Sequence, residues 1–322
     1  MSSVNLMVIA VGGNSLISAK EKVTVEDQYA AIQKTVRHVA DIVETGRRVC
    51  ITHGNGPQVG FILRRSEIAR KVAGMHPVPL PSCVADTQGA LGWQIQQALT
   101  NELQRRGLGA TSRGMAVSVV TQVVVDADDP AFATPDKYVG EVFQEADLPT
   151  LSTDYPHWVL KKDRGRGWRR VVPSPRPLEI IELPAIRSLL ERGHVVVAVG
   201  GGGVPVVRGE DGELRGVSAV VDKDLATGLL AAQLGADLLV ISTAVRQVSL
   251  HFGEPGQQEL GQVTTAELQA YQAQGHFPPG SMGPKITAAL AFLAQGGQKV
   301  IITSPDNLIP ALEHGAGTHI TS

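Results

Sequence analysis

Three lysines lie in stretches that could handle a transferring phosphoryl group. Lys223 stands between Asp222 and Asp224 in "VVDKDLATGLLA", Lys285 ends "PPGSMGPK", and Lys137 lies in "ATPDKYVG". Lys223 and Lys285 fall where helices are predicted to begin, and the helix dipole repels a cation there unless an anion is near. Phosphoryl transfer needs cations around the transferring group and donors on its oxygens. These positions therefore indicate a site for phosphorylated ligands, with the two aspartates orienting Lys223 or helping to hold a magnesium–nucleotide.

Three apolar stretches of the chain run into glycine-rich turns. They are "VIAVGGNSL" (8–16), "VCITHGNGPQVG" (49–60) and "VVVAVGGGGVPVV" (195–207). Glycine leaves the backbone N–H groups of such a turn open to an anion, and the helix that follows strengthens the attraction. Asn14 and Asn55 add amide donors without adding charge. Together the turns predict that a phosphate is held at one edge of a sheet.

Two widespread phosphate-binding motifs do not occur in the sequence. There is no GxxxxGK[ST] stretch, which excludes a P-loop. "GNGPQVG" (54–60) loosely resembles a dinucleotide fingerprint, but its glycines are misspaced, and Glu67 and Asp86 miss the position that would bind a ribose. Hydride transfer is therefore a poor alternative. The histidines form no metal-ligand cluster, and Cys50 and Cys83 lack ligand spacing, so no protein-bound metal site is predicted.

The composition excludes several classes of partner. Of the 322 residues, 43% are hydrophobic and 19% are charged, and the net charge is −2. Such a chain can bury a sizeable core, but it has no basic field for nucleic acid or for a membrane surface. The chain enters its first predicted strand directly after "MSSVN", and no apolar run is long enough to span a bilayer. We therefore expect a cytoplasmic protein without a nucleic-acid or membrane partner.

Apolar runs alternate with helical patterns along the chain. The runs are rich in Val and Ile without polar alternation, as in strands covered on both faces, and they occupy residues 5–11, 48–52, 116–125, 194–199, 237–243 and 299–303. Helical patterns, each followed by a glycine, occupy residues 25–45, 85–106, 183–191 and 219–233. This alternation predicts an α/β fold in which a parallel sheet lies between layers of helices. Ligands of such sheets bind beyond the carboxyl ends of the strands, where the glycine turns lie.

The segment 126–177 breaks this alternation. It contains much of the proline and six aromatic residues: Phe132, Tyr138, Phe143, Tyr155, Trp158 and Trp168. We predict an inserted subdomain with a small core of its own, which projects as a lid from a single domain spanning residues 1–322. Its basic run "KKDRGRGWRR" (161–170) is expected to form a solvated hairpin that turns at residues 165–167.

Several stretches, in order along the chain, resemble one known family. They are "VGGNSL", "THGNGPQVG", "VADTQGALGWQIQQAL", "VVTQVVVDADDPAF", "VGGGGVPVV", "VDKDLATGLLA", "GHFPPGSMGPKI" and the closing "GTHI". The chain is similar to carbamate kinase, of the amino-acid-kinase superfamily, over essentially its whole length. "HGNGPQVG" and "GSMGPK" are highly specific for this family.

The resemblance implies a fold and a reaction. The fold would be a three-layer α/β/α sandwich with a mostly parallel central sheet and a protruding subdomain near the active site, assembled as a homodimer. The reaction would be magnesium-dependent and reversible: carbamoyl phosphate and ADP give carbamate and ATP, in many bacteria as the last step of arginine or purine-derived catabolism. Carbamate is already nucleophilic at its oxygen, so no general base and no catalytic histidine are expected.

The resemblance also assigns roles to individual residues. The catalytic groups would be Lys223, Lys285, Lys137, Asp224 and Asn14. Of these, the first two would neutralise the transferring oxygens, Asp224 would orient both, and Lys137 would reach down from the lid. The transferring phosphate and carbamate would be lined by Gly12, Gly13, Asn14, Gly54, Asn55 and Gly56. The nucleotide, ATP or ADP, would lie along Gly200, Gly201, Gly202, Gly203, Asp222, Thr243, Ala244, Val245, Met282 and Gly283.

The lid string departs from the family pattern. The family commonly has a "TKPIG"-like string, whereas this chain has "DKYVG", so that Asp136 precedes Lys137 and Tyr138 replaces a proline. A carboxylate beside the lysine would partly neutralise it, and loss of the proline loosens the loop. The hypothesis is weakened binding of carbamoyl phosphate or a shifted substrate. Two alternatives stay open: a kinase for a different small carboxylic acid, and a catalytically silent ligand-binding homologue.

Overall fold

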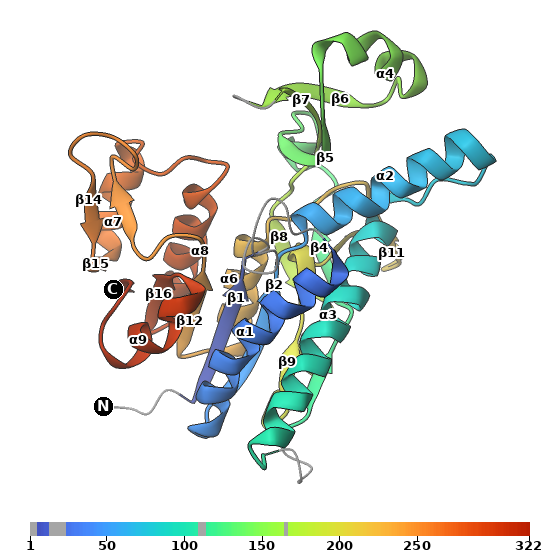
Figure 1. The fold of residues 1–322 in the computed structure, drawn as a ribbon. Helices are drawn as coiled ribbons and strands as arrows, with labels where there is room; N and C mark the ends of the chain where they lie inside the picture. Colours follow the sequence, from blue (N-terminus) through green and yellow to red (C-terminus); the bar gives the residue numbers. More distant parts are fainter. Residues whose placement is uncertain (1–4, 13–23, 109–113, 164–166) are drawn as a thin grey trace.

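A central sheet of eight strands organises the chain (Figure 1). The computed structural model describes residues 5–12, 24–108, 114–163 and 167–322. Neighbouring strands are parallel except for the pair β16 and β17. The order across the sheet is β15 (Gln262–Thr264), β17 (Thr318–Thr321), β16 (Lys299–Thr303), β12 (Leu238–Ser242), β1 (Leu6–Val11), β2 (Arg48–His53), β9 (Val195–Val197) and β3 (Ala116–Ser118).

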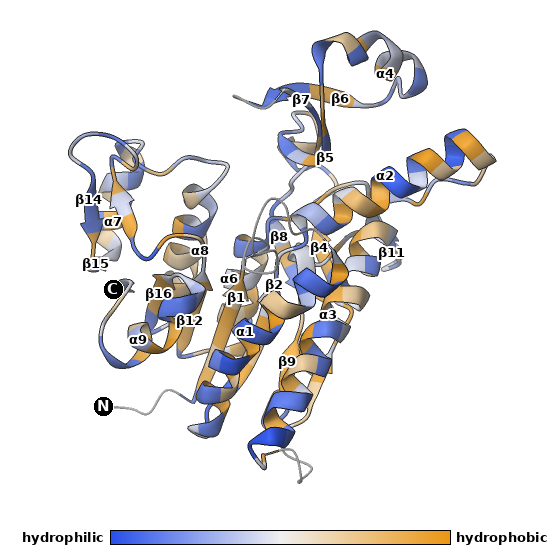
Figure 2. Cartoon of the chain, viewed as in Figure 1, coloured by the Kyte–Doolittle hydropathy of each residue, from blue (hydrophilic) through white to orange (hydrophobic). Residues whose placement is uncertain are grey.

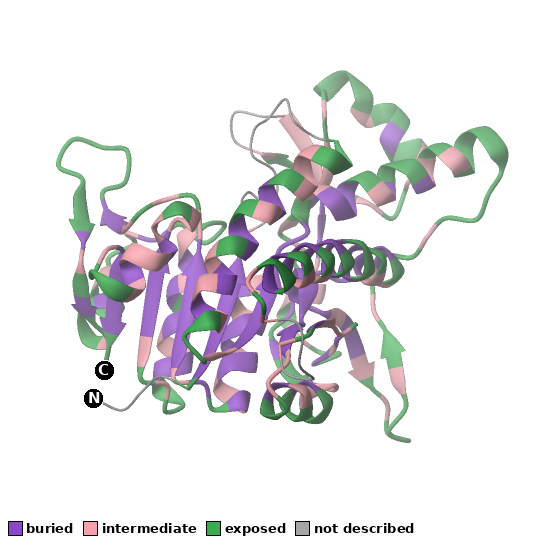
Figure 3. Ribbon diagram, turned by 60° about the horizontal axis from the view of Figure 1, so that its bottom comes forward, coloured by how far each residue is buried: buried purple, intermediate pink, exposed green. Residues whose placement is uncertain are grey.

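Two layers of helices cover this sheet, and alternate side chains of β1 point into the two cores between them. One layer consists of α5 (Leu183–Glu191), α6 (Lys223–Leu234) and α8 (Met282–Ala294). The other consists of α1 (Val25–Glu44), α3 (Leu80–Arg105) and α9 (Leu308–Glu313). The strands are apolar and buried, whereas the outer faces of the helices are polar and exposed (Figures 2 and 3). The predicted α/β sandwich with a mostly parallel central sheet is confirmed.

The three glycine-rich turns lie at one edge of the sheet. Strands β1, β2 and β9 are parallel neighbours, so their carboxyl ends meet. Gly12, Gly54 and Gly200 follow these strands, and the backbone N–H of Gly54 donates to the Val11 carbonyl at 3.0 Å. The three turns therefore share the edge of the sheet that is formed by the carboxyl ends of the strands, as the sequence predicted.

The apolar run 116–125 is two strands, so the prediction of a single strand is wrong. Its first part is β3, and its second part is β4, in a separate sheet. The chain breaks at the buried Thr121, whose hydroxyl donates to the Val119 carbonyl and accepts from the Val199 N–H. The second sheet has the order β11 (Leu214–Gly216), β10 (Val204–Arg208), β4 (Gln122–Val125) and β8 (Pro177–Ile180).

Helix boundaries also differ from the sequence pattern. Helix α3 begins at Leu80 rather than residue 85, and α6 begins at Lys223 rather than residue 219. Helix α2 (Gly56–Ala73) has few apolar residues at helical spacing, and the pattern did not predict it. Of the helices in the described part of the chain, none is both long and apolar enough to cross a membrane.

The segment between β4 and β8 projects from the sandwich, at the top of Figure 1. We call residues 126–177 the lid. Its antiparallel sheet has β7 in the centre, between β5 and β6, and Tyr155 stacks on Trp158 with ring centroids 4.0 Å apart. Its basic run lies on β6 and β7, and residues 165 and 166 of the turn expected at 165–167 lie outside the described residues. The lid elements are η2 (Pro130–Phe132), β5 (Lys137–Phe143), η3 (Glu145–Asp147), α4 (Leu148–Asp154), β6 (Val159–Asp163) and β7 (Gly167–Val172).

A smaller projection stands on the other side of the sheet edge. It follows β12 and leads into α8, and it contains β13 (Val248–Leu250), β14 (Gln258–Leu260) and α7 (Thr265–Ala273). In Figure 1 this projection and the lid flank the edge that carries the glycine turns. Two short 3₁₀ helices complete the described elements outside the lid: η4 (Gly200–Gly202) and η5 (Pro305–Asn307).

Candidate active site

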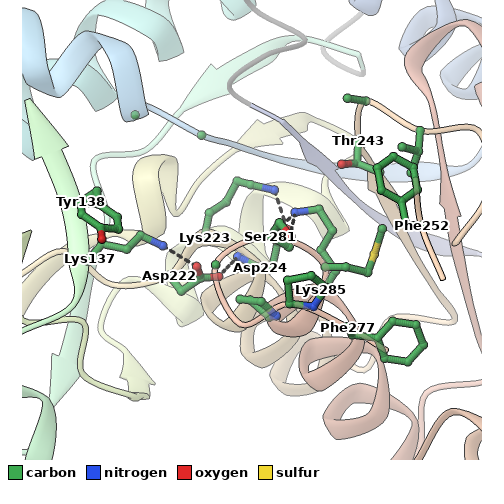
Figure 4. Close-up of a pocket in the computed structure, with 18 of the residues that line it drawn as sticks. Lys137, Tyr138, Asp222, Lys223, Asp224, Thr243, Phe252, Phe277, Ser281 and Lys285 are labelled. Atoms are coloured by element: carbon green, nitrogen blue, oxygen red, sulfur yellow. Dashed lines mark hydrogen bonds and ion pairs between the residues drawn. The ribbon is translucent and has the colours of Figure 1, made fainter. Parts of the chain in front are cut away.

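A pocket of about 880 Å³ lies at this edge, walled by the lid, the sandwich and the β13–α8 projection (Figure 4). Its volume is typical of sites for small molecules and cofactors, about 300–1,000 Å³. Many predicted site residues line it: Gly54, Asn55, Gly56, Lys137, Gly201, Asp222, Lys223, Asp224, Thr243, Ala244, Val245, Met282 and Lys285. The predicted Gly13 and Asn14 lie outside the described residues.

Two lysines in the wall share one buried carboxylate. Lys223 Nζ lies 2.6 Å from Asp224 Oδ1, and Lys285 Nζ lies 2.9 Å from Asp224 Oδ2 (Figure 4). The Asp224 side chain is only 6% exposed. Burial by itself would raise the pKa of Asp224, but the two ammonium groups outweigh burial and lower this pKa to about 2. With both lysines protonated, the cluster carries one net positive charge into the pocket.

Close packing of α6 on α8 brings these lysines together. Lys223 is the first residue of α6, and Lys285 lies in the first turn of α8. The helices approach closely at Gly228, where a Cβ would lie only 3.1 Å from the Ala288 carbonyl oxygen. Both ammonium groups therefore sit at positive helix ends, where a cation is unfavourable alone. Asp224 offsets this repulsion.

The third lysine, Lys137, reaches the pocket from the lid. It is the first residue of β5, and its Nζ lies 2.5 Å from Asp222 Oδ2. Asp222 is the N-cap of α6, where its Oδ1 accepts hydrogen bonds from the backbone N–H groups of Asp224 and Leu225. One carboxylate thus connects the lid to the helix that carries Lys223.

Lys137 forms its ion pair with Asp222 and not with Asp136, its neighbour in the sequence. Asp136 is exposed and does not line the pocket. Tyr138, which replaces the proline of the family string, does line it, and its hydroxyl donates to the Lys162 carbonyl at 3.0 Å. The departure in the lid therefore reaches the pocket through the aromatic ring.

The turn at 200–203 packs tightly against side chains of the site. Gly201 has a φ of +65°, and a Cβ there would lie 2.1 Å from Asn55 Nδ2. A Cβ on Gly200 would lie 2.4 Å from His53 Nε2. The two glycines thus leave room for the His53 and Asn55 side chains. Other predicted residues are described but do not line the pocket: Gly12, Gly200, Gly202, Gly203 and Gly283.

His53 packs behind the pocket wall, next to Gly200, and no role was predicted for it because no catalytic histidine was expected. Its imidazole is buried, and Nδ1 lies 3.0 Å from the Gly54 carbonyl oxygen. Burial lowers the pKa of His53 to about 4, and the nearby Lys223 acts in the same direction. The ring is therefore neutral at neutral pH and donates from Nδ1. The sequence did contain a signal for a histidine near the site, because His53 directly follows an apolar run and lies inside "THGNGP".

The end of the pocket away from the lid is largely aromatic. His251 and His276 meet edge to face with ring centroids 4.6 Å apart, and Phe252 and Phe277 also line this end. Flat apolar walls of this kind suit a planar ring system. His251 and Phe252 directly follow β13, and His276 and Phe277 lie in the loop between α7 and α8, so no single motif contains all four.

The chain belongs to the amino acid kinase family, whose profile matches residues 5–304. Within this family it is similar to carbamate kinases. "Carbamate kinase-like protein YahI" of Escherichia coli (strain K12) is 50% identical, and "Carbamate kinase" of Thermococcus kodakarensis is 44% identical, each over 98% of both chains. The structure of carbamate kinase from Giardia lamblia bound to AMP-PNP matches with a TM-score of 0.90 at 39% identity, covering 100% of this chain and 99% of that chain. The resemblance recognised in the sequence is confirmed.

Proposed function

We propose that the protein transfers a phosphoryl group reversibly between ATP and carbamate, so that carbamoyl phosphate and ADP give carbamate and ATP. The observation that carries this proposal is the Lys223–Asp224–Lys285 cluster in the wall of the pocket. Relatives named carbamate kinase, one of them with AMP-PNP bound, support the substrate and the nucleotide.

The lysine cluster supplies the electrostatic part of the reaction. In the direction of ATP synthesis, the bond from phosphorus to the carbamate oxygen breaks and a bond to the terminal oxygen of ADP forms. Negative charge spreads over the three remaining phosphoryl oxygens in the transition state. Lys223 and Lys285 would neutralise this charge, and Asp224 holds both ammonium groups in place before the reaction begins. No proton has to move, which agrees with a neutral, buried His53.

Backbone and amide groups would hold the small substrate. Gly54, Asn55 and Gly56 line the pocket where α2 begins, and the backbone N–H groups of a helix start attract an anion. Asn55 Nδ2 donates to Thr87 Oγ1 at 2.8 Å, which fixes the orientation of the side-chain amide. Lys137 would leave Asp222 to contact the phosphoryl group of carbamoyl phosphate.

Magnesium is a further part of the proposal. Among the described residues, no group of three or more His, Cys, Asp or Glu side chains could hold a metal ion. Carboxylate oxygens suit this hard cation, and the pocket wall offers Asp222, whose single lysine partner can exchange. Asp222 would thus help to hold a magnesium ion that arrives with the nucleotide. The ion would neutralise charge on the nucleotide phosphates.

We also propose that the protein is a homodimer. Strand β3 is the last strand of the central sheet, and two large apolar side chains near it are exposed, Trp93 on α3 and Val120 after β3. Exposed apolar surface beside an open sheet edge suits a second copy of the chain. Light scattering should give twice the mass of the chain, and Trp93→Glu should shift the protein toward the monomer. A parent protein that is monomeric at micromolar concentration would contradict the proposal.

The experiment that tests the reaction is a coupled assay of ATP formation from ADP and an acyl phosphate. We expect ATP from carbamoyl phosphate and not from acetyl phosphate. Tyr138 in the pocket wall is the observation that favours a second candidate, a kinase for a different small carboxylic acid. ATP formation only with other acyl phosphates would select that candidate. No ATP with any of them would indicate the silent homologue and overturn the proposal.

A further inference from the structure

A second pocket lies between the lid and the sandwich. Its volume is about 280 Å³, and it shares no lining residue with the larger pocket among the residues that the structure describes. Its walls come from α2, from residues 77–79 and the first residue of α3, Leu80, from Ser218, and from the lid residues around Trp158 and Arg170. The mechanism above uses none of them.

Arg170 brings an incompletely bonded cation to this pocket. Its side chain is only 16% exposed, and burial lowers the pKa of its guanidinium. Its charged partner Glu67 lies 3.9 Å away, which is too far for a hydrogen bond, while the Trp158 ring covers one face at 4.8 Å. Within the described part of the chain, the guanidinium makes no hydrogen bond, although it has five N–H donors. None of its nitrogens is among the fully buried atoms without a partner in the described residues, so the guanidinium is open to the pocket and is suited to an anion there.

The charge of the walls favours an anion with a single charge. Arg70 is a second guanidinium of the pocket and lies over the Tyr155 ring at 5.1 Å. Glu67 lies in the same walls and, when ionised, offsets one of these two positive charges. Burial raises the pKa of Glu67 to about 7, although Arg170 acts in the opposite direction. The walls therefore carry between one and two net positive charges near neutral pH, and a dianion would meet the Glu67 carboxylate as it ionises.

The remaining walls are largely apolar. Leu63 and Leu80 face the pocket together with Val78 and the neighbouring prolines, and the stacked Tyr155 and Trp158 rings form the lid side. Such walls favour a ligand with an apolar or aromatic body. We propose that this pocket binds a small monocarboxylate, whose carboxylate pairs with the Arg170 guanidinium and whose apolar body lies against Leu63 and Leu80.

Calorimetric titration of the full-length protein with benzoate tests this proposal without any assay of catalysis. We expect the parent to bind benzoate, and Arg170→Met to weaken binding about tenfold or more, because the paired cation is lost. Two controls should bind as the parent does: Arg65→Met, an exposed arginine of α2 outside the pocket, and Lys223→Met in the larger pocket. Absence of binding to the parent, parent-like affinity of Arg170→Met, or loss only in Lys223→Met would overturn the proposal.

A second variant guards against misfolding of Arg170→Met. Glu67→Gln keeps the shape of the side chain and removes the charge that competes with the ligand. At about pH 8, we expect this variant to bind benzoate at least about threefold more tightly than the parent, because Glu67 is mostly ionised there. An unchanged affinity would contradict the assigned site. Inorganic phosphate at millimolar concentration should not displace benzoate, and equal displacement would overturn the choice of a monocarboxylate.

Discussion

The lysines of the sandwich and the lysine of the lid are held in different ways. Lys223 and Lys285 are 13% and 15% exposed and share one carboxylate, so two cations face one anion on packed helices. Lys137 is 35% exposed and faces Asp222 alone, on a strand at the edge of the lid. The first arrangement keeps a fixed positive charge at the site. The second arrangement is the single ion pair of Lys137 with Asp222, which has no net charge and whose partners can separate.

This difference separates two tasks. A fixed charge in a buried cluster can stabilise a transition state without rearrangement of the protein. A lysine on a projecting lid can contribute only after it leaves its present partner, so its effect should appear mainly in substrate binding. The predictions below test this division of roles, from the largest expected effect to the smallest.

Lys223→Ala should lower kcat in the coupled assay by about 10²–10³-fold, because one of the two fixed cations is lost. The affinity for ADP, measured by calorimetry, should change only modestly. Lys34→Ala, an exposed lysine of α1, is the matched control and should retain parental turnover. A Lys223→Ala enzyme with near-parental kcat would refute the role of the cluster.

Lys137→Met should raise the KM for carbamoyl phosphate by about tenfold and lower kcat less than Lys223→Ala does. The physical reason is that the lid cation contacts the substrate only when the pair with Asp222 opens. Lys161→Met, which removes an exposed lysine of the same lid, should leave KM unchanged. Equal losses of kcat in Lys137→Met and Lys223→Ala would remove the distinction between the two regions.

A pH-dependent contact between the lid and the sandwich should be visible in thermal stability. Burial raises the pKa of Glu67 from 4.5 to about 7. Between these values the folded protein keeps a proton that the unfolded chain has released, so this group lowers stability as the pH rises through the window and adds no further change above it. Glu67→Gln lacks this effect, and its Tm relative to the parent should rise by roughly 2–4 °C from pH 5 to pH 8.

The comparison needs a control for the loss of one carboxylate. Glu191→Gln, an exposed residue of α5, provides it. A Tm difference for Glu67→Gln that does not vary with pH would show that this carboxyl titrates as it does in the unfolded chain.

The smallest effect is expected at Asp136. The sequence suggested that this carboxylate weakens the lid lysine, but it is exposed and outside the pocket wall. Asp136→Thr should therefore change the KM for carbamoyl phosphate by less than about twofold, because water screens an exposed charge. A severalfold decrease in KM would restore the hypothesis drawn from the sequence.

Sequence patterns predicted the centre of the fold better than its margins. Strands β1 and β16 match their predicted runs closely, because a strand buried on both faces leaves an uninterrupted apolar signal. The run 116–125 gave the same signal, yet it serves two sheets, since hydropathy carries no information about which sheet a residue joins. Helix α2 was missed because it begins in a glycine-rich stretch and buries only a narrow stripe.

The site could be predicted only where one short motif contains its chemistry. The cluster around Lys223 was accessible because Asp222 and Asp224 are its sequence neighbours. The meeting of Asp224 with Lys285, 61 positions away, needed the packing of α6 on α8. Phe252 gave no signal, and Phe277 was not assigned a role although it lies in "GHFPPGSMGPKI", because a single phenylalanine normally belongs to a core.

The position of Asp222 at the start of α6 would lower the free-energy cost of separating Lys137 from it. Its Oδ1 accepts hydrogen bonds from two backbone N–H groups, and these bonds do not involve Lys137, which contacts Oδ2. If Lys137 leaves, the positive end of α6 still stabilises the Asp222 carboxylate. The negative charge of Asp222 would then repel an anionic substrate less strongly. The helix that presents Lys223 would thereby allow Lys137 to leave Asp222 while the contact between Lys223 and Asp224 is kept.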